Sequence, residues 1–394
     1  MSKQNNDLRF LDGLRGLAAL YVMIGHTRLM LWEGFTTGYK LHPEQYSKLS
    51  TWLMYFLSLF KYGHEAVLLF FVLSGFVIHL KYARQIKREG IKAKFDTLSY
   101  YWRRLKRVYP PLILALGLTL FWDKLGLWLE LPVYLANSPY PQVNHSAVFF
   151  HDWYAFIGNL LSVQIAVWNV PVWGTNGPLW SLALEVWFYV FYPLMFLAAR
   201  RTAIGSFLLM ITISYIARRT DMYLVQNYIP LVFFNRVLFP MLFWWFGVVV
   251  ADIYTGRINL KMEWLSMLMP LAVLLTYLPT RFLYLDTPAL HSAMFFAGML
   301  ATLLWIQKYI TLDWLAKLKW LGDMSYSLYI HHMPLVVFMS GLLMARSGGL
   351  LPQSQWMIVF GACICLAYGY LTSLIAEKPF TRAKLKEKVQ EPAQ

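Results

Sequence analysis

The chain has 394 residues, of which 58% are hydrophobic and only 14% are charged, and it carries a net charge of +15. A soluble domain of this size is about half apolar and about a quarter charged. The composition therefore excludes an ordinary soluble protein and predicts an integral membrane protein. The positive charge does not indicate nucleic-acid binding, because we find no nucleic-acid motif and no soluble segment large enough to carry one.

Ten apolar runs predict an all-α, polytopic membrane protein with about ten transmembrane helices. The predicted spans are residues 13–33, 63–82, 109–130, 178–199, 203–218, 236–254, 264–280, 289–308, 322–344 and 354–376. A further apolar segment, 151–170, is interrupted by polar residues, and we interpret it as re-entrant or interfacial. We expect residues 1–380 to form one membrane domain and residues 381–394 to form a polar cytoplasmic tail.

The distribution of charge predicts the orientation. With the amino terminus in the cytoplasm and ten spans, most of the 35 Lys and Arg residues fall on the cytoplasmic side, many of them in the predicted loop 81–107. This is the positive-inside bias of membrane proteins. Counting 151–170 as a span would reverse every later loop. We therefore expect both termini in the cytoplasm and place the protein in a bacterial inner membrane.

The first apolar run, LDGLRGLAALYVMIGH, contains Arg15 and His26. Eleven residues make about three helical turns and roughly 16 Å of rise, so both side chains lie on one stripe of the helix. Taken alone, Arg15 is equally compatible with an interface residue whose charge reaches the headgroups. His26 lies well inside the span, where a polar side chain usually faces a cavity or a partner. The alternative for His26 is a structural hydrogen bond to a neighbouring helix.

Another span carries a carboxylate at about the same predicted depth in the membrane as His26. Glu185 lies in PLWSLALEVWFYVFYP, about seven residues from the start of the span near Pro178. It is placed to pair with His26 and to orient its ring. A structural, hydrogen-bonded glutamate is the alternative, and the sequence leaves the two interpretations evenly matched.

The basic segment YYWRRLKRVYPP precedes the third span. Arg104 and Arg107 are three residues apart and share a helical face, and paired guanidiniums suit phosphate oxygens. Tyr101 can stack on a base or lie among the headgroups. Taken alone, such a segment is more typical of a topology and lipid anchor.

Other polar residues are secondary candidates. His64, at the far-side mouth of the second span, can bind an acceptor, although an exposed polar helix cap is the more ordinary interpretation. His332 lies in the middle of the ninth span, where it can face a cavity. Ser74 is near mid-membrane, but we do not propose it as a nucleophile, because no base is placed beside it in the sequence.

Six motifs occur in this order: LDGLRGLAALYVMIGH, LLFFVLSGFVI, YYWRRLKRVYPP, PLWSLALEVWFYVFYP, GDMSYSLYIHHMP and AEKPF. Together they resemble the acyltransferase-3 family of membrane O-acyltransferases, from Leu8 to about Phe380. The resemblance implies a ten-helix membrane domain that takes an acyl group, commonly acetyl, from cytoplasmic acyl-coenzyme A. It implies transfer to a hydroxyl, usually of a sugar, on the far side of the membrane.

The resemblance also implies roles for particular residues. The family's motifs fall on Arg15 and His26, on Arg104 and Arg107, on Trp180 to Glu185, on His332 and Pro334, and on Glu377 and Pro379. Together with the candidates above, we expect His26 and Glu185 to be catalytic, Arg15, Arg104, Arg107 and Tyr101 to bind the donor, His332, Trp180 and His64 to bind the acceptor, and Glu377 and Pro379 to form a structural motif.

The expected partners follow from these roles. They are acyl-CoA, with acetyl-CoA as the main candidate, a glycan or glycolipid acceptor, and membrane lipids. We expect no metal. Some family members carry a fused esterase-like domain, and this chain ends too soon to contain one, so we expect it to act alone or with a separate periplasmic partner.

Two mechanisms fit these expectations. His26 either removes a proton from the acceptor hydroxyl or carries the acyl group itself. One rival is a polytopic transporter or flippase of a cell-envelope glycan precursor, because buried ionisable residues and broken segments also suit translocation. Another is a sensor or scaffold that binds acyl-CoA without chemistry.

Overall fold

The computed structural model describes residues 8–135, 138–146, 150–164, 170–224, 234–282 and 288–380. These residues form α-helices and contain no β-strand. The long helices are α2 (Phe10–Met30), α4 (Gly63–Glu89), α5 (Thr97–Trp128), α8 (Leu179–Ala199), α9 (Ala203–Leu224), α11 (Phe239–Tyr254), α12 (Met262–Phe282), α13 (Pro288–Ile306), α16 (Ser325–Arg346) and α17 (Trp356–Ala376). Shorter helices include α3 (Lys48–Ser58), α6 (Pro141–Ser146), α7 (Trp153–Leu160), α14 (Asp313–Lys317) and α15 (Lys319–Gly322). The predicted all-α fold class is confirmed.

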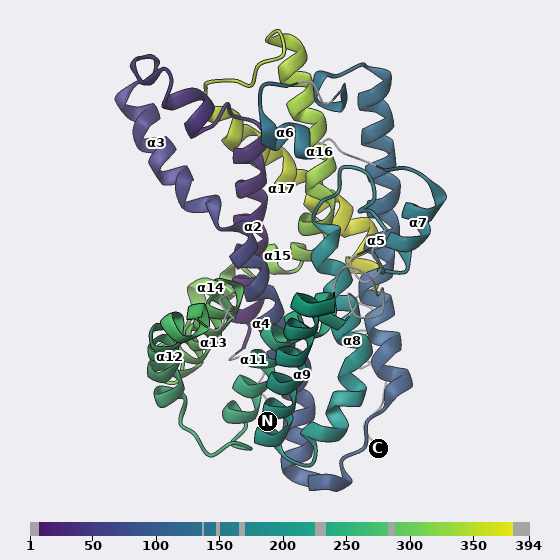
Figure 1. The fold of residues 1–394 in the computed structure, drawn as a ribbon, viewed down its shortest axis with the longest axis vertical. Coiled ribbons are helices and arrows are strands. Elements are labelled where there is room, and N and C mark those ends of the chain that lie inside the picture. Colours follow the sequence, from purple (N-terminus) through teal and green to yellow (C-terminus); the bar gives the residue numbers. More distant parts are fainter. Residues whose placement is uncertain are drawn as a thin grey trace.

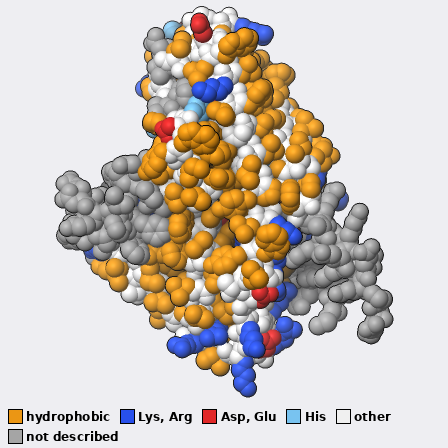
Figure 2. Space-filling model, turned by 90° about the vertical axis from the view of Figure 1, so that its right-hand side faces the viewer, with side chains coloured by type: hydrophobic (Ala, Val, Ile, Leu, Met, Phe, Trp, Pro, Cys, Tyr) orange, Lys and Arg blue, Asp and Glu red, His pale blue; other side chains and the backbone are white. Residues whose placement is uncertain are grey.

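The chain is an integral membrane protein. Within the described ranges, seven helices are long and apolar enough to span a membrane, namely α4, α5, α8, α11, α13, α16 and α17. The other three predicted spans correspond to α2, α9 and α12, which are of similar length but include charged residues such as Arg15 and Glu263. Figure 2 shows hydrophobic side chains covering the middle of the molecule, as expected for a surface that faces lipid.

The segment 151–170 does not form one spanning helix in its described part. α7 has eight residues, which is about 12 Å of rise and far less than a bilayer requires. Residues 165–169 lie outside the described residues. The short helix agrees with the prediction of a re-entrant or interfacial segment.

The predicted loop 81–107 is largely helical, which corrects the boundaries of two spans. α4 continues to Glu89 and ends at Gly90, whose positive φ of 59° suits glycine. α5 begins earlier than predicted, because Asp96 caps it by accepting a hydrogen bond from the Ser99 amide at 3.0 Å. Arg104 and Arg107 therefore lie on one continuous helix.

The two ends of the molecule differ in charge. The turn between α4 and α5 lies at the lower end in Figure 1, and α3 lies near the upper end. Figure 2 shows Lys and Arg side chains gathered at the lower end. We call the end with the α4–α5 turn the basic end and the end with α3 the opposite end.

Helix α2 packs closely against its neighbours and contacts α4, α14, α15, α16 and α17. A Cβ atom built on Gly13 would lie 1.9 Å from the carbonyl oxygen of Leu315, and one built on Gly16 would lie 2.6 Å from the amide nitrogen of Gly322. Small residues let helix backbones approach in this way within a membrane. The close packing fixes the stripe that carries Arg15 and His26.

We expect Gly13→Ala to destabilise the protein by about 1–3 kcal/mol, because the added methyl group collides with backbone. The matched control is Gly117→Ala in α5, where an added Cβ meets no atom within 4 Å. Thermal unfolding in detergent should show a lower midpoint for Gly13→Ala and an unchanged or higher midpoint for Gly117→Ala. Equal midpoints for the two variants would contradict the close approach of α2 to α14.

Candidate functional site

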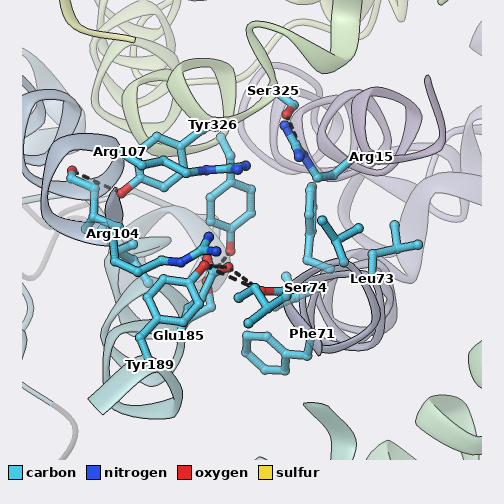
Figure 3. Close-up of a pocket in the computed structure, with 18 residues that line it drawn as sticks. Arg15, Phe71, Leu73, Ser74, Arg104, Arg107, Glu185, Tyr189, Ser325 and Tyr326 are labelled. Carbon is cyan, nitrogen blue, oxygen red and sulfur yellow. Dashed lines mark hydrogen bonds between the residues drawn. The ribbon is translucent and has the colours of Figure 1, made fainter. Parts of the chain in front are cut away.

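Three arginines and one carboxylate face a small cavity among α2, α4, α5, α8 and α16. We call this cavity, with a volume of about 70 Å³, the arginine pocket, and its polar lining includes Arg15, Arg104, Arg107, Glu185 and Tyr189. Figure 3 shows the three guanidinium groups reaching toward it from α2 and α5. The pocket carries an excess of positive charge and suits an anionic ligand.

Arg15 is held in place by the start of α16. Its Nε donates to Ser325 Oγ at 3.3 Å, and its Nη2 donates to the carbonyl oxygen of Gly322 at 3.1 Å. Asp12 lies 3.9 Å away, one turn earlier on α2. These contacts favour a fixed residue of the pocket over a freely extended interface side chain.

The basic side chains of α5 point in two directions, some into the arginine pocket and some away from it. Arg104 and Arg107 line the arginine pocket, as their predicted shared face requires. The Arg104 guanidinium lies over the rings of Tyr100 and Tyr189, at 5.6 and 5.2 Å from their centroids.

The neighbouring residues of the same segment do not line the pocket. Arg103 donates to Ser99 and to the hydroxyl of Tyr82, and Lys106 lies over the ring of Trp102. Tyr101 donates to the carbonyl oxygen of Val190 at 2.9 Å, so the structure does not bring its ring into the pocket.

Glu185 lies in the arginine pocket and does not contact His26. Its Oε1 accepts hydrogen bonds from Ser74 Oγ at 2.9 Å and from the hydroxyl of Tyr189. Residue counting placed Glu185 and His26 at similar depth, but depth does not determine the direction in which a helical side chain points. The expected pairing of these two residues is therefore wrong.

The partner of His26 is His332. The Nδ1 atom of His26 lies 2.7 Å from the Nε2 atom of His332, and the two rings are stacked with centroids 5.0 Å apart. His332 Nδ1 lies 2.9 Å from the carbonyl oxygen of Leu328. A carbonyl only accepts, so His332 Nδ1 carries the proton, and its Nε2 accepts from His26 Nδ1 in the neutral rings. The remaining nitrogen of His26, Nε2, is then unprotonated and able to act as a base or a nucleophile.

A larger cavity of about 380 Å³ contains His26, and we call it the histidine pocket. Its lining includes His64 and Trp180, whose rings stack with centroids 5.3 Å apart and an interplanar angle of 12°. The structure thus brings His26, His64 and Trp180 into the lining of one cavity. His332 is buried behind His26, with 1% of its surface exposed, and it does not line the pocket.

The two pockets share one wall. Val67 and Tyr329 line both of them. The hydroxyl of Tyr329 forms a hydrogen bond of 2.6 Å with Ser181 Oγ, and its ring packs edge-on against Phe70. A single layer of side chains therefore separates the arginine pocket from the histidine pocket.

Sequence reasoning missed the roles of Ser325 and Tyr329, although both occur in the quoted motif GDMSYSLYIHHMP. Ser325, Tyr329 and His332 are spaced by four and three residues, so they share one face of α16. This face contacts Arg15 at one end and His26 at the other. Helical spacing within the motif was the signal that could have identified them.

Glu377 joins the end of α17 to the start of α16. Its Oε2 accepts from the amide nitrogen of Ser327 at 3.1 Å and from Ser327 Oγ at 2.9 Å. Carboxylates stabilise helix amino termini in this way. Pro379 follows on the surface. The geometry supports the expectation that Glu377 has a structural role.

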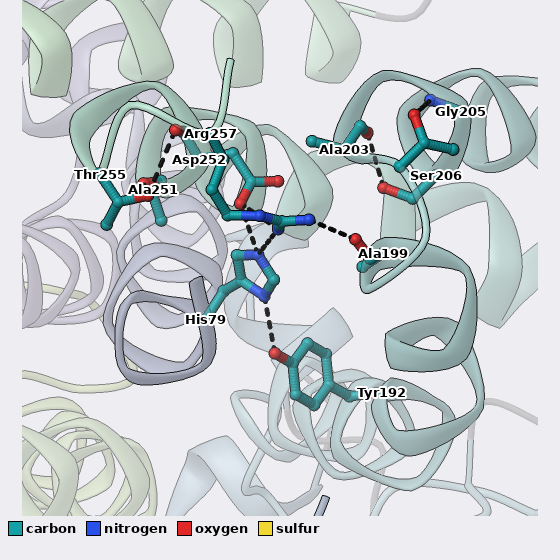
Figure 4. A network of polar contacts seen from close by, with 11 residues as sticks. His79, Tyr192, Ala199, Ala203, Gly205, Ser206, Ala251, Asp252, Thr255 and Arg257 are labelled. Carbon is teal, nitrogen blue, oxygen red and sulfur yellow. Dashed lines mark hydrogen bonds and ion pairs between the residues drawn. The ribbon is translucent and has the colours of Figure 1, made fainter. Parts of the chain in front are cut away.

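A second polar cluster, shown in Figure 4, lies outside both pockets. His79 contacts the hydroxyl of Tyr192 at 2.7 Å and Asp252 Oδ1 at 2.9 Å, and Arg257 donates to the same carboxylate oxygen at 2.6 Å. Arg257 also donates to the carbonyl oxygen of Ala199. The cluster joins α4, α8 and α11 and was not predicted, because its members are far apart in the sequence.

The comparisons with known proteins agree with this arrangement. A family model described as an acyltransferase domain matches residues 8–372. Searches of curated proteins and of solved structures returned no match. Because the matched region covers nearly the whole chain, the protein is a membrane acyltransferase and belongs to the acyltransferase-3 family.

Proposed function

We propose that the protein moves a short acyl group, with acetyl as the main candidate, from acyl-CoA to a hydroxyl of a glycan or glycolipid. The donor binds at the arginine pocket, and the acceptor binds in the histidine pocket. The observation that carries this proposal is the position of His26, whose free Nε2 belongs to a pocket one side-chain layer away from three arginines. The basic end then faces the cytoplasm of a bacterial cell, with both termini on that side.

The arginine pocket fits a phosphate group of the donor, and the acyl end of the donor then points from this pocket toward Tyr329 and His26. Its volume of about 70 Å³ is room for about two water-sized groups, so it can receive part of the donor, such as a phosphate group, and not the whole of coenzyme A. Arg15, Arg104 and Arg107 supply cationic donors for phosphate oxygens. The adenosine of coenzyme A is too large for this cavity and would remain toward the basic end.

The histidine pocket fits a carbohydrate acceptor. Its volume of about 380 Å³ lies in the range of small-molecule sites. The stacked rings of Trp180 and His64 provide a flat surface for a sugar ring. His26 is then within the same cavity as the acceptor hydroxyl.

In direct transfer, His26 Nε2 takes the proton of the acceptor hydroxyl as its oxygen attacks the thioester carbonyl. The C–S bond breaks, and the imidazolium returns its proton to the departing thiolate of coenzyme A. The hydrogen bond from His26 Nδ1 to His332 steadies the positive charge that develops on the ring. Both substrates must reach one cavity, so the side-chain layer at Tyr329 has to open.

In the second route, His26 Nε2 attacks the thioester carbonyl, the C–S bond breaks, and coenzyme A leaves as a thiolate, which leaves an acyl-imidazolium that keeps its Nδ1 proton. The acceptor oxygen then attacks the acyl group, and its proton passes to the released imidazole nitrogen. Incubation with radiolabelled acetyl-CoA in the absence of acceptor distinguishes the routes. Label on His26 supports the second route, and strict ternary-complex kinetics supports the first.

His332 provides a further prediction. We expect His332→Leu to lower kcat by about 10- to 100-fold, the range typical of residues that orient a functional histidine, because His26 loses the acceptor for its Nδ1 proton. His332→Gln offers an amide oxygen at a similar position and should recover much of this loss. Steady-state kinetics should show little change in the KM for acetyl-CoA. Equal losses in the two variants would contradict the positioning role.

The function itself is tested with purified protein in detergent, acetyl-CoA and glycans extracted from a cell envelope. The proposal predicts thiol release that requires the glycan and an acylated product. Uptake of glycan into proteoliposomes without acyl transfer would instead support the transporter alternative.

A further inference from the structure

We infer that the acceptor carries an anionic group, a carboxylate or a phosphate, near the hydroxyl that receives the acyl group. This inference rests on the proposed function and specifies its substrate class. It follows from the cations that line the histidine pocket, because they lack acidic partners there.

Arg28 is the first of these cations. It lies in the last turn of α2, two residues beyond His26, and lines the histidine pocket. Its Nε atom is buried without a hydrogen-bond partner, and its side chain forms no hydrogen bond or ion pair with any described residue. A buried donor atom without a partner is costly, so the Nε of Arg28 is suited to a partner that arrives with the substrate.

Lys61 is the second cation. It belongs to the short helix η3 (Leu59–Lys61) and lines the same pocket. Its ammonium group lies 4.9 Å from the centroid of the exposed Tyr62 ring, a contact that leaves its charge uncompensated by an anion.

The described lining of the histidine pocket contains no Asp or Glu. Glu65 follows His64 in the sequence but is not part of that lining. A neutral acceptor would leave two positive charges without a counter-charge in the cavity. A carboxylate or phosphate would accept two parallel hydrogen bonds from the planar guanidinium of Arg28.

The placement of Arg28 also orients the acceptor. Arg28 lies about 3 Å further along the axis of α2 than His26, toward the opposite end. The anionic group would therefore bind nearer the opposite end of the molecule, and the hydroxyl would face His26. The aromatic pair Trp180 and His64 lines the same cavity and can hold the sugar ring between these two points.

The test is equilibrium binding to the full chain in detergent, followed by tryptophan fluorescence, because Trp180 lines the pocket. The ligands are glucuronic acid, glucose 1-phosphate and the neutral methyl glucoside. We expect at least one anionic sugar to bind about tenfold or more tightly than the neutral sugar, as one hydrogen-bonded charge pair provides. The stronger of the two anions identifies the carboxylate or the phosphate as the preferred group.

Arg28→Gln should reduce this preference about tenfold, and Arg28→Lys should retain part of it. The matched control is Arg346→Gln, at the exposed end of α16 and outside the histidine pocket, which should leave the preference unchanged. Equal affinity for neutral and anionic sugars, or an unchanged preference in Arg28→Gln, would overturn the inference. Because binding is measured without turnover, a failure of acyl transfer would be detected separately as the absence of thiol release.

Discussion

Replacing His26 with Gln is expected to lower kcat for acyl transfer by about 100- to 10,000-fold, the contribution of a positioned general base. His26 Nε2 is the one unprotonated ring nitrogen of the His26–His332 pair that is still free to react, because His332 Nε2 already accepts a hydrogen bond from His26 Nδ1. Glutamine keeps a polar side chain of similar size but cannot take up the proton or carry the acyl group. The affinity for acetyl-CoA should change little, because the three arginines remain.

The measurement is acceptor-dependent thiol release from acetyl-CoA, with donor binding determined separately. His42→Gln is the control, because His42 lies on an exposed turn and is 3.9 Å from Glu44, outside both pockets. It should behave like the unsubstituted protein. A His26→Gln variant with the parental kcat would remove His26 from the chemistry.

The second large effect concerns the donor. We expect the double variant Arg104→Ala/Arg107→Ala to raise the Kd for acyl-CoA by at least about 10- to 100-fold. A hydrogen bond to a charged group contributes about 1.5–3 kcal/mol, and about 1.4 kcal/mol corresponds to a factor of ten in affinity. The reduction in affinity should exceed the change in kcat, because these arginines lie one side-chain layer away from His26.

The same segment offers a control with equal charge. Arg103→Ala/Lys106→Ala removes two positive charges from the same part of α5, but these residues contact Tyr82 and Trp102 outside the arginine pocket. This variant should bind acyl-CoA nearly as the parent does. If both double variants bind acyl-CoA equally, the arginines act as lipid anchors and the arginine pocket is not the donor site.

The helices could be predicted from the sequence because apolar runs of spanning length have few other stable structures in a bilayer. Helical periodicity also placed Arg104 and Arg107 on one face. These predictions depend on local properties of single segments. The early start of α5 was missed because the basic residues around Arg104 resemble a loop, whereas the cap at Asp96 extends the helix through them.

The contacts between helices could not be predicted in the same way. Residue counts placed His26 and Glu185 at similar depth, but the rotation of α8 directs Glu185 toward Ser74 and Tyr189. His332 was expected to bind the acceptor, yet it lies behind His26 as its hydrogen-bond partner. Rotation and tilt follow from packing against neighbouring helices, which a single sequence does not reveal.

The central claim is that His26 serves substrates that arrive from opposite sides of the membrane. It is tested most directly in proteoliposomes that enclose an envelope glycan and receive radiolabelled acetyl-CoA only from outside. We predict that label appears on the enclosed glycan with the parent protein and not with His26→Gln. Label that appears only when donor and glycan share one compartment would contradict the account.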